Sequence, residues 1–409
     1  MNIIFLGGVH TDSLAQYIRV KSIGPMQNAA DVLQKNYIYG LTKISLINNI
    51  DVINLPYVGS YPSYFKDKKF HAIANNETIY ERCNVHNHSF NNIKGLKNLS
   101  RFFISLRSIL TVQKKDENYI IVCYSMHLPF LLSCYLTRLL RKKSKYYIII
   151  PDLPEYMSVR KGITKLVHNV ISKISYYIVN KSNGAALITS HMSERFEPTL
   201  NYVVIEGISP PAKFTDFDKD SDDWWPDNLV KNQYFLYTGT LDKRYGIRDL
   251  INAFIKANVK EHILVICGDG NDRPYVLNMS MQNANIKYLG QMEYHKIKIL
   301  QENAALLINP RSSEGEYTKY SFPSKIIEYM NSGVPVLMYR LEGIPDSYLE
   351  YFYEIKSKDD FVHKLNMIST MKSKELKAMG EKAKDFIITH TNPIKQANKL
   401  VTLFFEDKK

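Results

Sequence analysis

Short apolar runs rich in β-branched and aromatic residues alternate along the chain with segments whose apolar residues recur about every three to four positions. The first pattern predicts buried strands and the second predicts amphipathic helices. In the first half of the chain, the predicted strands are residues 3–6, 52–55, 119–123, 146–150, 186–189 and 202–205. The predicted helices are residues 28–35, 96–110, 129–141, 163–181 and 190–196. Because these strands are apolar on both faces, we expect a parallel sheet covered by helices on both sides.

The alternation stops at residues 209–233, which hold two prolines, an acidic tract and Trp224-Trp225-Pro226, and it then resumes. Such a segment predicts a linker between domains. Beyond it, the predicted strands are residues 234–237, 262–267, 286–289, 305–308 and 334–338. The predicted helices are residues 246–256, 294–302, 324–331, 359–371 and 393–405. We therefore expect an α/β protein of two Rossmann-like domains, residues 1–208 and 209–389, with a C-terminal helix at 390–409 packing back on the first.

Positive charge is concentrated in the first half. Residues 1–206 hold 25 Lys and Arg against 13 Asp and Glu, which is a net charge of +12 out of +13 for the 409 residues. A basic half suits nucleic acid, an anionic membrane surface or a polyanionic substrate, and a solvated surface is the alternative. No nucleic-acid-binding motif accompanies the charge, so we expect no nucleic-acid partner.

The cysteines and the apolar runs bear on location. Four separated cysteines with no C-x-x-C spacing suit a reducing compartment and argue against a zinc site or a disulfide framework. The N-terminus is typical of a short strand rather than a secretory signal. The apolar runs are shorter than the roughly 20 residues that span a bilayer. We expect a cytoplasmic protein.

Two glycine turns follow predicted strands of the second half. In residues 237–247 a strand leads through Gly239 to Lys243 and Arg244, and then into a helix at Gly246. Glycine permits close backbone approach, a helix N-terminus attracts anions, and cations add charge-assisted bonds, so this turn predicts a phosphate site. A plain turn with solvated cations is the alternative. Residues 267–270, Cys-Gly-Asp-Gly, predict either a platform for a nucleotide ring or a structural turn.

Residues 309–336 are the most informative segment. Pro323 suits the first turn of a helix, which places Ser324 and Lys325 at its positive end, where a diphosphate would bind. Glu328 lies one turn further on and can accept hydrogen bonds from ribose hydroxyls. An internal salt bridge between Glu328 and Lys325 is the alternative.

Five motifs, taken in order, resemble the C-terminal domain of GT-B glycosyltransferases. They are T-G-T-L-x-x-R-Y-G-I, C-G-D-G, Y-L-G, N-P-x-x-x-E-G and F-P-S-K-I-I-E-Y-M-x-S-G-V-P-V. The resemblance covers about residues 234–340 and is closest to the retaining family 4, or glycosyl transferases group 1. It implies two Rossmann-like domains with an interdomain cleft, and a nucleotide-sugar substrate of the UDP or GDP type rather than a cofactor. The implied donor contacts are diphosphate binding by Gly8, Gly239, Lys243, Arg244, Ser324 and Lys325, ribose binding by Glu328, and base binding by Gly268, Gly290 and Met292.

The chain departs from the family pattern near the phosphates and near the sugar. Thr240 and Tyr245 stand where G-R-L-x-x-x-K-G has Arg and Lys, so Lys243 and Arg244 are expected to supply the charge. The family's first glutamate, eight residues before the second, falls at Tyr320.

Two residues are the candidates for catalysis. Either an insertion brings Glu314 to the sugar, with Glu316 as the other candidate, or this chain lacks that glutamate. His127 lies just past a predicted strand, where ligands gather in open α/β sheets, and is predicted to contact the transferred sugar or the acceptor. A structural histidine is the alternative.

The resemblance implies sugar transfer from a nucleoside diphosphate sugar to a hydroxyl of a glycan acceptor, lipid-linked, in bacterial surface polysaccharide synthesis. The resemblance implies retention of configuration. Cations and a helix N-terminus at the leaving diphosphate would make a metal unnecessary, and no D-x-D motif follows a strand. The basic segments 138–145 and 161–181 predict peripheral contact with an anionic membrane at the inner face of the plasma membrane, or else a core-facing helix with a solvated edge. The alternative functions are another GT-B enzyme, such as a sugar-nucleotide epimerase or an inverting transferase, and a non-catalytic binding or scaffold protein.

Overall fold

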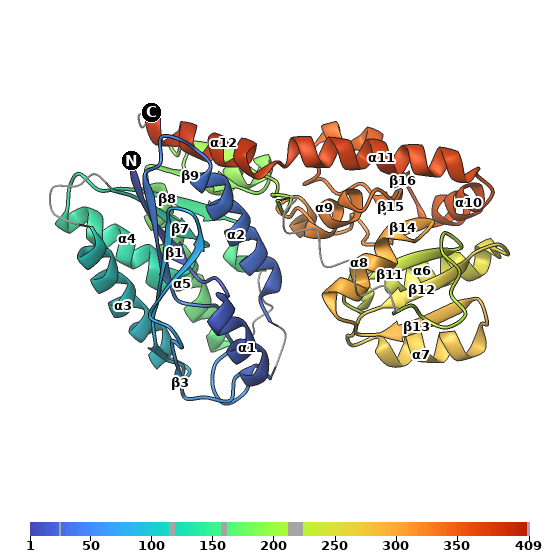
Figure 1. Cartoon of the computed structure of the whole chain (residues 1–409), viewed down its shortest axis with the longest axis horizontal. Coiled ribbons are helices and arrows are strands. Elements are labelled where there is room, and N and C mark those ends of the chain that lie inside the picture. Colours follow the sequence, from blue (N-terminus) through green and yellow to red (C-terminus); the bar gives the residue numbers. More distant parts are fainter. Residues whose placement is uncertain (24–25, 114–118, 157–161, 212–223, 407–409) are drawn as a thin grey trace. The chain divides into compact units, whose positions relative to one another are not determined.

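The computed structural model divides the chain into two compact units, each built on its own parallel sheet (Figure 1). Unit 1 comprises Met1–Pro211 and Asn392–Lys409, and unit 2 comprises Ala212–Thr391, so the division lies within three residues of the predicted boundaries. The structure describes residues 1–23, 26–113, 119–156, 162–211 and 224–406. The acidic tract of the predicted linker lies outside these residues.

The main sheet of unit 1 has eight strands in the order β10-β9-β8-β7-β1-β2-β5-β4. All neighbours are parallel except β4, which pairs antiparallel with β5. The strands are β1 (Asn2–Gly7), β2 (Asn49–Asn54), β4 (Asn76–Tyr80), β5 (Cys83–Asn87), β7 (Tyr119–Tyr124), β8 (Lys145–Ile150), β9 (Gly184–Leu187) and β10 (Tyr202–Val204). A separate pair joins β3 (Lys69–Phe70) to β6 (Phe90–Asn91). Because β1 and its neighbours are buried on both faces, their apolar residues do not alternate with polar ones.

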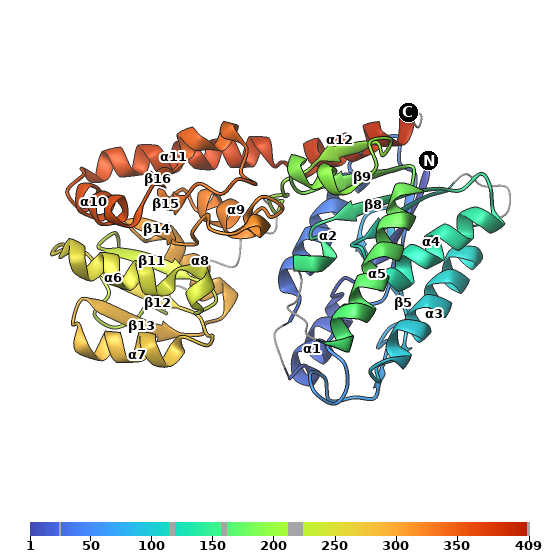
Figure 2. The same cartoon turned by 180° about the vertical axis from the view of Figure 1, so that it is seen from behind.

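Helices cover both faces of the unit 1 sheet (Figures 1 and 2). On one face, α2 (Asn28–Thr42) packs along α12 (Pro393–Phe405), and both contribute to one hydrophobic core. On the other face, α3 (Leu96–Val112), α4 (Leu128–Leu140) and α5 (Ile163–Asn180) lie side by side. The short helix α1 (Asp12–Lys21) follows the turn after β1. The C-terminal helix therefore completes the core of the first unit.

Unit 2 contains a six-stranded parallel sheet in the order β13-β12-β11-β14-β15-β16. Its strands are β11 (Tyr234–Thr238), β12 (Ile263–Cys267), β13 (Ile286–Gly290), β14 (Leu306–Asn309), β15 (Val336–Tyr339) and β16 (Tyr353–Ile355). Counted from β11, this is the 3-2-1-4-5-6 order of a Rossmann domain. Its helices are α6 (Ile247–Ala257), α7 (Arg273–Gln282), α8 (Tyr294–Glu302), α9 (Ser324–Asn331), α10 (Lys358–Ser369) and α11 (Ser373–His390). Helices α6, α7 and α10 share one core with the sheet, whereas α9 packs against α11.

The observed elements agree with most of the predicted ones. Every predicted strand overlaps an observed one, and α8, α9 and α12 have the predicted bounds. Residues 190–196 were predicted as a helix and form only a 3₁₀ turn, Ser190–Arg195. The pattern missed α1, α7, α11, β16 and the strands between residues 69 and 91, and in α7 only Val276 is buried, so no apolar stripe marks it. Within the described part of the chain, no helix is both long and apolar enough to cross a membrane.

Candidate functional site

The carboxyl ends of the unit 2 strands meet at one edge of the sheet, because all of the strands are parallel. The turns after β11 and β12 begin at Gly239 and Gly268, and β13 ends at Gly290. Strand β11 lies beside β14, and right-handed connections leave these two strands toward opposite faces. Open α/β sheets bind ligands at such a switch point.

Close backbone contact joins the three predicted glycine turns. The φ of Gly268 is +139°, and a Cβ there would lie 1.8 Å from the carbonyl oxygen of Gly239. The Gly268 N–H donates to the carbonyl of Gly290 at 2.8 Å. Met292, the other predicted base-binding residue, approaches the same edge, with its Sδ 3.9 Å from the Sγ of Cys267. The four residues are therefore near one another, and their contacts with a ligand stay a prediction.

A cluster of polar side chains joins α9 to the end of β11. Lys325 Nζ lies 3.2 Å from Glu328 Oε2 and donates to Thr238 Oγ1 at 3.2 Å. The side chain of Lys325 is 35% exposed and that of Glu328 is 23% exposed, so both remain accessible from solvent. Burial by itself lowers the pKa of Lys325, but Glu328, Tyr329 and Cys267 together outweigh burial, so the pKa is raised and the ammonium is charged at neutral pH. The salt bridge anticipated as the alternative role of Glu328 is thus present, and ribose binding by Glu328 stays a prediction.

Two residues that the sequence analysis did not single out hold this cluster in place. Gln301 of α8 donates to Glu328 Oε1 at 2.7 Å and to Thr238 Oγ1 at 3.1 Å. The Tyr329 hydroxyl accepts from the backbone N–H of Thr238 at 3.0 Å and donates to its carbonyl at 3.1 Å. Tyr329 directly follows Glu328 in the motif, but nothing local marks Gln301, whose partners lie in other elements.

The N-terminus of α9 has no side-chain cap, although the Ile326 N–H donates to the Pro323 carbonyl at 3.0 Å. The helix begins at Ser324, and Pro323 is its N-cap rather than part of its first turn as predicted. No described side chain caps this terminus, because proline offers no side-chain acceptor. The first-turn N–H groups, the positive end of the helix dipole and Lys325 therefore lie together, which is an arrangement suited to an anion.

Arg244 is held by a neighbouring carboxylate. Its Nε and Nη2 donate to the two oxygens of Asp242 at 2.9 and 3.0 Å, and Asn271 donates to the same carboxylate at 3.1 Å. The hydrogen bonds from Arg244 hold the pKa of Asp242 well below its usual range. The Arg244 side chain is 65% exposed, and Lys243 beside it is exposed. Both predicted cations lie at the carboxyl edge of the sheet, but Asp242 already neutralises Arg244.

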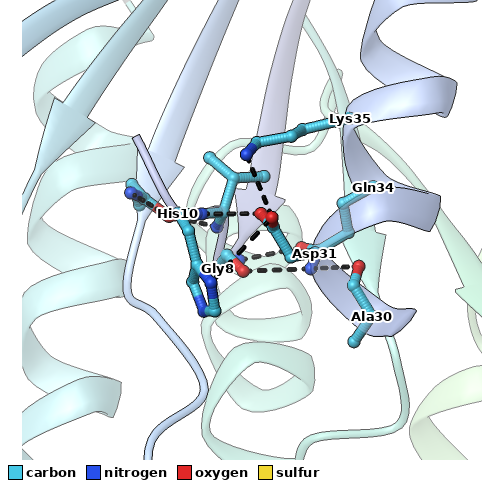
Figure 3. A network of polar contacts seen from close by, with 8 residues as sticks. Gly8, His10, Ala30, Asp31, Gln34 and Lys35 are labelled. Carbon is cyan, nitrogen blue, oxygen red and sulfur yellow. Dashed lines mark hydrogen bonds and ion pairs between the residues drawn. The ribbon is translucent and has the colours of Figure 1, made fainter. Parts of the chain in front are cut away.

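In unit 1, the turn after β1 is tied to α2 by a polar network (Figure 3). Gln34 accepts from the Gly8 N–H at 2.8 Å and donates to the Gly8 carbonyl at 3.0 Å. Asp31 accepts from the His10 N–H at 2.6 Å and pairs with Lys35 at 3.0 Å. The backbone N–H of Gly8, which was predicted to face the donor phosphates, is therefore engaged within unit 1.

Sequence and structure comparisons relate this chain to known proteins. Residues 220–386, which contain the unit 2 site, match the profile of the family described as Glycosyl transferases group 1. The whole chain is similar in fold to sucrose-phosphate synthase from Thermosynechococcus elongatus, with a TM-score of 0.64 and 14% identity over 99% of this chain and 98% of that chain. The chain therefore has the GT-B fold, and its second unit carries the match to the group 1 glycosyl transferases.

Other similar GT-B structures contain UDP. TarM from S. aureus, solved with UDP, has a TM-score of 0.60 and 12% identity over 99% of this chain and 100% of that chain. HepE from Anabaena, also solved with UDP, has a TM-score of 0.59 and 12% identity over the same shares. No curated protein sequence matches this chain significantly.

The predicted sugar-binding glutamate, Glu314, lies on the loop after β14 and is exposed. Tyr320, at the position of the family's first glutamate, is buried. A catalytic role for Glu314 stays a prediction.

His127 of unit 1 is packed among aromatic rings. Its ring lies 4.8 Å from that of Phe130 and 5.9 Å from that of Tyr57, centroid to centroid. Burial, with the charges of Arg101 and Lys97, holds the pKa of His127 well below its usual value, so the imidazole is neutral. Its Nε2 is buried and has no hydrogen-bond partner among the described residues. This environment favours the structural alternative, and contact with sugar or acceptor stays a prediction.

Within the described residues, no group of three or more His, Cys, Asp and Glu side chains is arranged to hold a metal ion. All four cysteines are buried as free thiols.

Proposed function

We propose that this protein is a glycosyltransferase that moves a sugar from a nucleoside diphosphate sugar to a hydroxyl of a lipid-linked glycan acceptor, in bacterial surface polysaccharide synthesis. The observation that carries the donor assignment is the pairing of Lys325 with the uncapped N-terminus of α9 at the switch point of a Rossmann-ordered sheet. The UDP bound in the TarM and HepE structures supports a nucleotide donor of the same kind.

The proposed chemistry places developing charge at the α9 terminus. As the bond between the anomeric carbon and the diphosphate oxygen breaks, the leaving diphosphate gains negative charge. The acceptor hydroxyl attacks the anomeric carbon and passes its proton to the leaving diphosphate oxygen. The Lys325 ammonium and the first-turn N–H groups of α9 would stabilise that charge, so the reaction would not require a divalent metal. Glu328, held by Gln301, would accept from the ribose hydroxyls. Retention of configuration rests on the family resemblance.

Ligand titration tests the donor assignment. The full-length protein should bind UDP or GDP in calorimetry, and Lys325→Ala should lower both affinity and turnover, the latter by roughly a hundredfold or more, because it removes a preorganised charge at the leaving group. Lys382→Ala, which breaks a surface Lys–Glu pair on α11, is the matched control and should change neither. A wild-type protein that binds neither nucleotide would support a scaffold role and contradict the proposal.

Product analysis separates the alternative enzymes. NMR of the reaction product should show a glycoside that retains the anomeric configuration of the donor, formed equally well with a chelator present. A free sugar or an epimerised nucleotide sugar indicates a different GT-B activity, and an inverted glycoside indicates an inverting transferase.

The acceptor side of the proposal rests on α5. Apolar side chains form an exposed stripe along this helix, with Leu166, Val167, Val170, Ile174 and Tyr177 each at least 40% exposed. Lys165, Lys173 and Lys181 accompany them along the same helix and its C-cap. The core-facing alternative does not account for these exposed side chains. An exposed apolar stripe with basic residues suits the surface of an anionic membrane, where a lipid-linked acceptor would be reached from the cytoplasm.

Vesicle binding tests this surface. The protein should sediment with vesicles of anionic phospholipid and much less with zwitterionic ones, and Leu166→Ser with Val170→Ser should reduce binding several-fold because burial of apolar area is lost. Met281→Ser, at an 81% exposed position of α7, is the control and should have no effect. Equal binding by the α5 variant and the wild type would contradict membrane docking through α5.

A further inference from the structure

Five arginines lie in the described part of unit 2, residues 224–391. Four of them pair with an aspartate: Arg244 with Asp242 at 2.9 Å, Arg248 with Asp272 at 2.5 Å, Arg273 with Asp269 at 3.9 Å and Arg340 with Asp346 at 2.5 Å. Arg311 is the exception, because none of the described carboxylates forms an ion pair with it. Its full positive charge is therefore not neutralised within this part of the chain.

The position of Arg311 is set by contact between two loops. It follows β14 by two residues, at the carboxyl edge where β14 adjoins β11. Gly246, which opens α6, has a φ of +79°, and a Cβ there would lie 2.0 Å from the carbonyl oxygen of Pro310. The turn after β11 thus rests directly on the backbone beside Arg311.

Neutral groups hold the guanidinium of Arg311. Its Cζ lies 5.0 Å from the ring centre of Tyr317 and 5.7 Å from that of Tyr245. Its Nη2 lies 3.4 Å from Ser321 Oγ, and its Nε is buried with no hydrogen-bond partner. Stacking on tyrosine orients a guanidinium without neutralising it. The result is an oriented cation with unused donors, at the edge where the nucleotide is proposed to bind.

We propose that Arg311 binds the diphosphate of the donor and supplies the charge that Thr240 and Tyr245 cannot. This rests on the proposed donor site. A guanidinium can give two parallel hydrogen bonds to phosphate oxygens. Arg311 lies over the ring of Tyr245, one of the two neutral residues that stand where the family pattern has a cation. Arg244 approaches the same site but gives two of its donors to Asp242, so it is the weaker candidate.

Calorimetry with UDP, UMP and uridine tests the assignment on the full-length protein. Arg311→Met should weaken UDP binding by about tenfold to a hundredfold, because a charge-assisted pair of hydrogen bonds is lost. It should leave uridine binding unchanged, with UMP affected less than UDP. Arg311→Lys keeps the positive charge but cannot form bidentate hydrogen bonds, so its loss of UDP affinity should be intermediate. Arg340→Met removes a paired arginine and should bind UDP as the wild type does.

The outcomes separate this inference from the proposed function. If Lys325→Ala loses UDP affinity while both Arg311 variants keep it, the inference is wrong and the donor site stands. If Arg311→Met weakens the binding of UDP and of uridine equally, Arg311 does not contact the diphosphate. The same conclusion follows if Arg311→Met weakens the binding of a nucleotide sugar but not that of UDP. If the wild type binds no nucleotide, it is the proposed function that fails. Thermal melting of each variant checks that it is folded. If Arg311→Met is not folded, the comparison of Arg311→Lys with the wild type provides the test.

Discussion

Single charged side chains at the carboxyl edge of unit 2 differ chiefly in whether they are already paired. Lys325 shares its charge with Glu328 but stays partly exposed, Arg244 is bound to Asp242, and Arg311 is held only by neutral groups. The type of residue does not distinguish these cases. For this reason each cation has a different expected effect on ligand binding and on stability.

Asp242 offers a test of pairing at the level of one residue. Asp242→Asn should lower the free energy of unfolding by about 1–2 kcal/mol at pH 7, because charge-assisted bonds to a largely exposed Arg244 are lost. The pKa of Asp242 is lowered in the folded state, so its contribution is complete above the unfolded pKa of about 3.9 and declines as the pH falls below it. Urea unfolding at pH 7, 5 and 3 should therefore show the two proteins converging at the acidic end.

Asp346→Asn is the control for that series, since Asp346 is 82% exposed and its pair with Arg340 should contribute little. A difference between Asp242→Asn and the wild type that stays constant from pH 7 to pH 3 would argue against the ion pair as its cause.

At the scale of elements, the turns rather than the helices make the strictest demands on sequence. Gly268 and Gly290 both have positive φ, but only Gly268 faces another backbone at close range. Gly290 has nothing within 4 Å of the place where a Cβ would be. Substitutions at the two glycines can therefore distinguish the cost of a positive φ from the cost of steric contact between the turns.

Alanine at each of these positions should give different losses. Gly290→Ala should lower the free energy of unfolding by about 1 kcal/mol, the cost of a positive φ for a residue with a side chain. Gly268→Ala should cost about 3 kcal/mol or more, because the β11 and β12 turns must also move apart. Urea denaturation of the two variants measures the difference, and similar losses would show that the turns can separate at little cost.

At the scale of the whole molecule, one helix near the C-terminal end of the sequence belongs to the unit that the N-terminal residues form. Helix α12 follows all of unit 2 in the sequence but packs on α2 in unit 1. Gly40 of α2 marks the contact, since a Cβ there would lie 2.2 Å from the carbonyl oxygen of Pro393. Leu400 lies fully buried in the same core. Unit 1 therefore cannot complete its core until the last residues of the chain are present.

Leu400→Ala should destabilise unit 1 by about 2–5 kcal/mol, the usual cost of a cavity in a packed core. Hydrogen exchange measured by mass spectrometry should show faster exchange in the strands and helices of unit 1 and unchanged exchange in those of unit 2. Ile394→Ala, at a 39% exposed position of α12, is the matched control and should change little. Faster exchange spread over both units would contradict the assignment of α12 to unit 1.

The sequence alone determined the alternation of strands and helices, the division into two units, the glycines at the strand ends and the family that the motifs resemble. These features depend on residues close together in the chain, where periodicity and backbone conformation act locally. The Lys325–Glu328 pair could be anticipated for the same reason, because both residues lie on one helix.

Only the tertiary structure decided how distant residues pair at the site. It placed Gln301 against Thr238 and Glu328, and it turned the Gly8 backbone toward Gln34. It also brought Arg311 over the ring of Tyr245, which lies on a different loop. Such contacts depend on the order of strands in the sheet, which sets the loops that meet at its edge and is not contained in any local pattern.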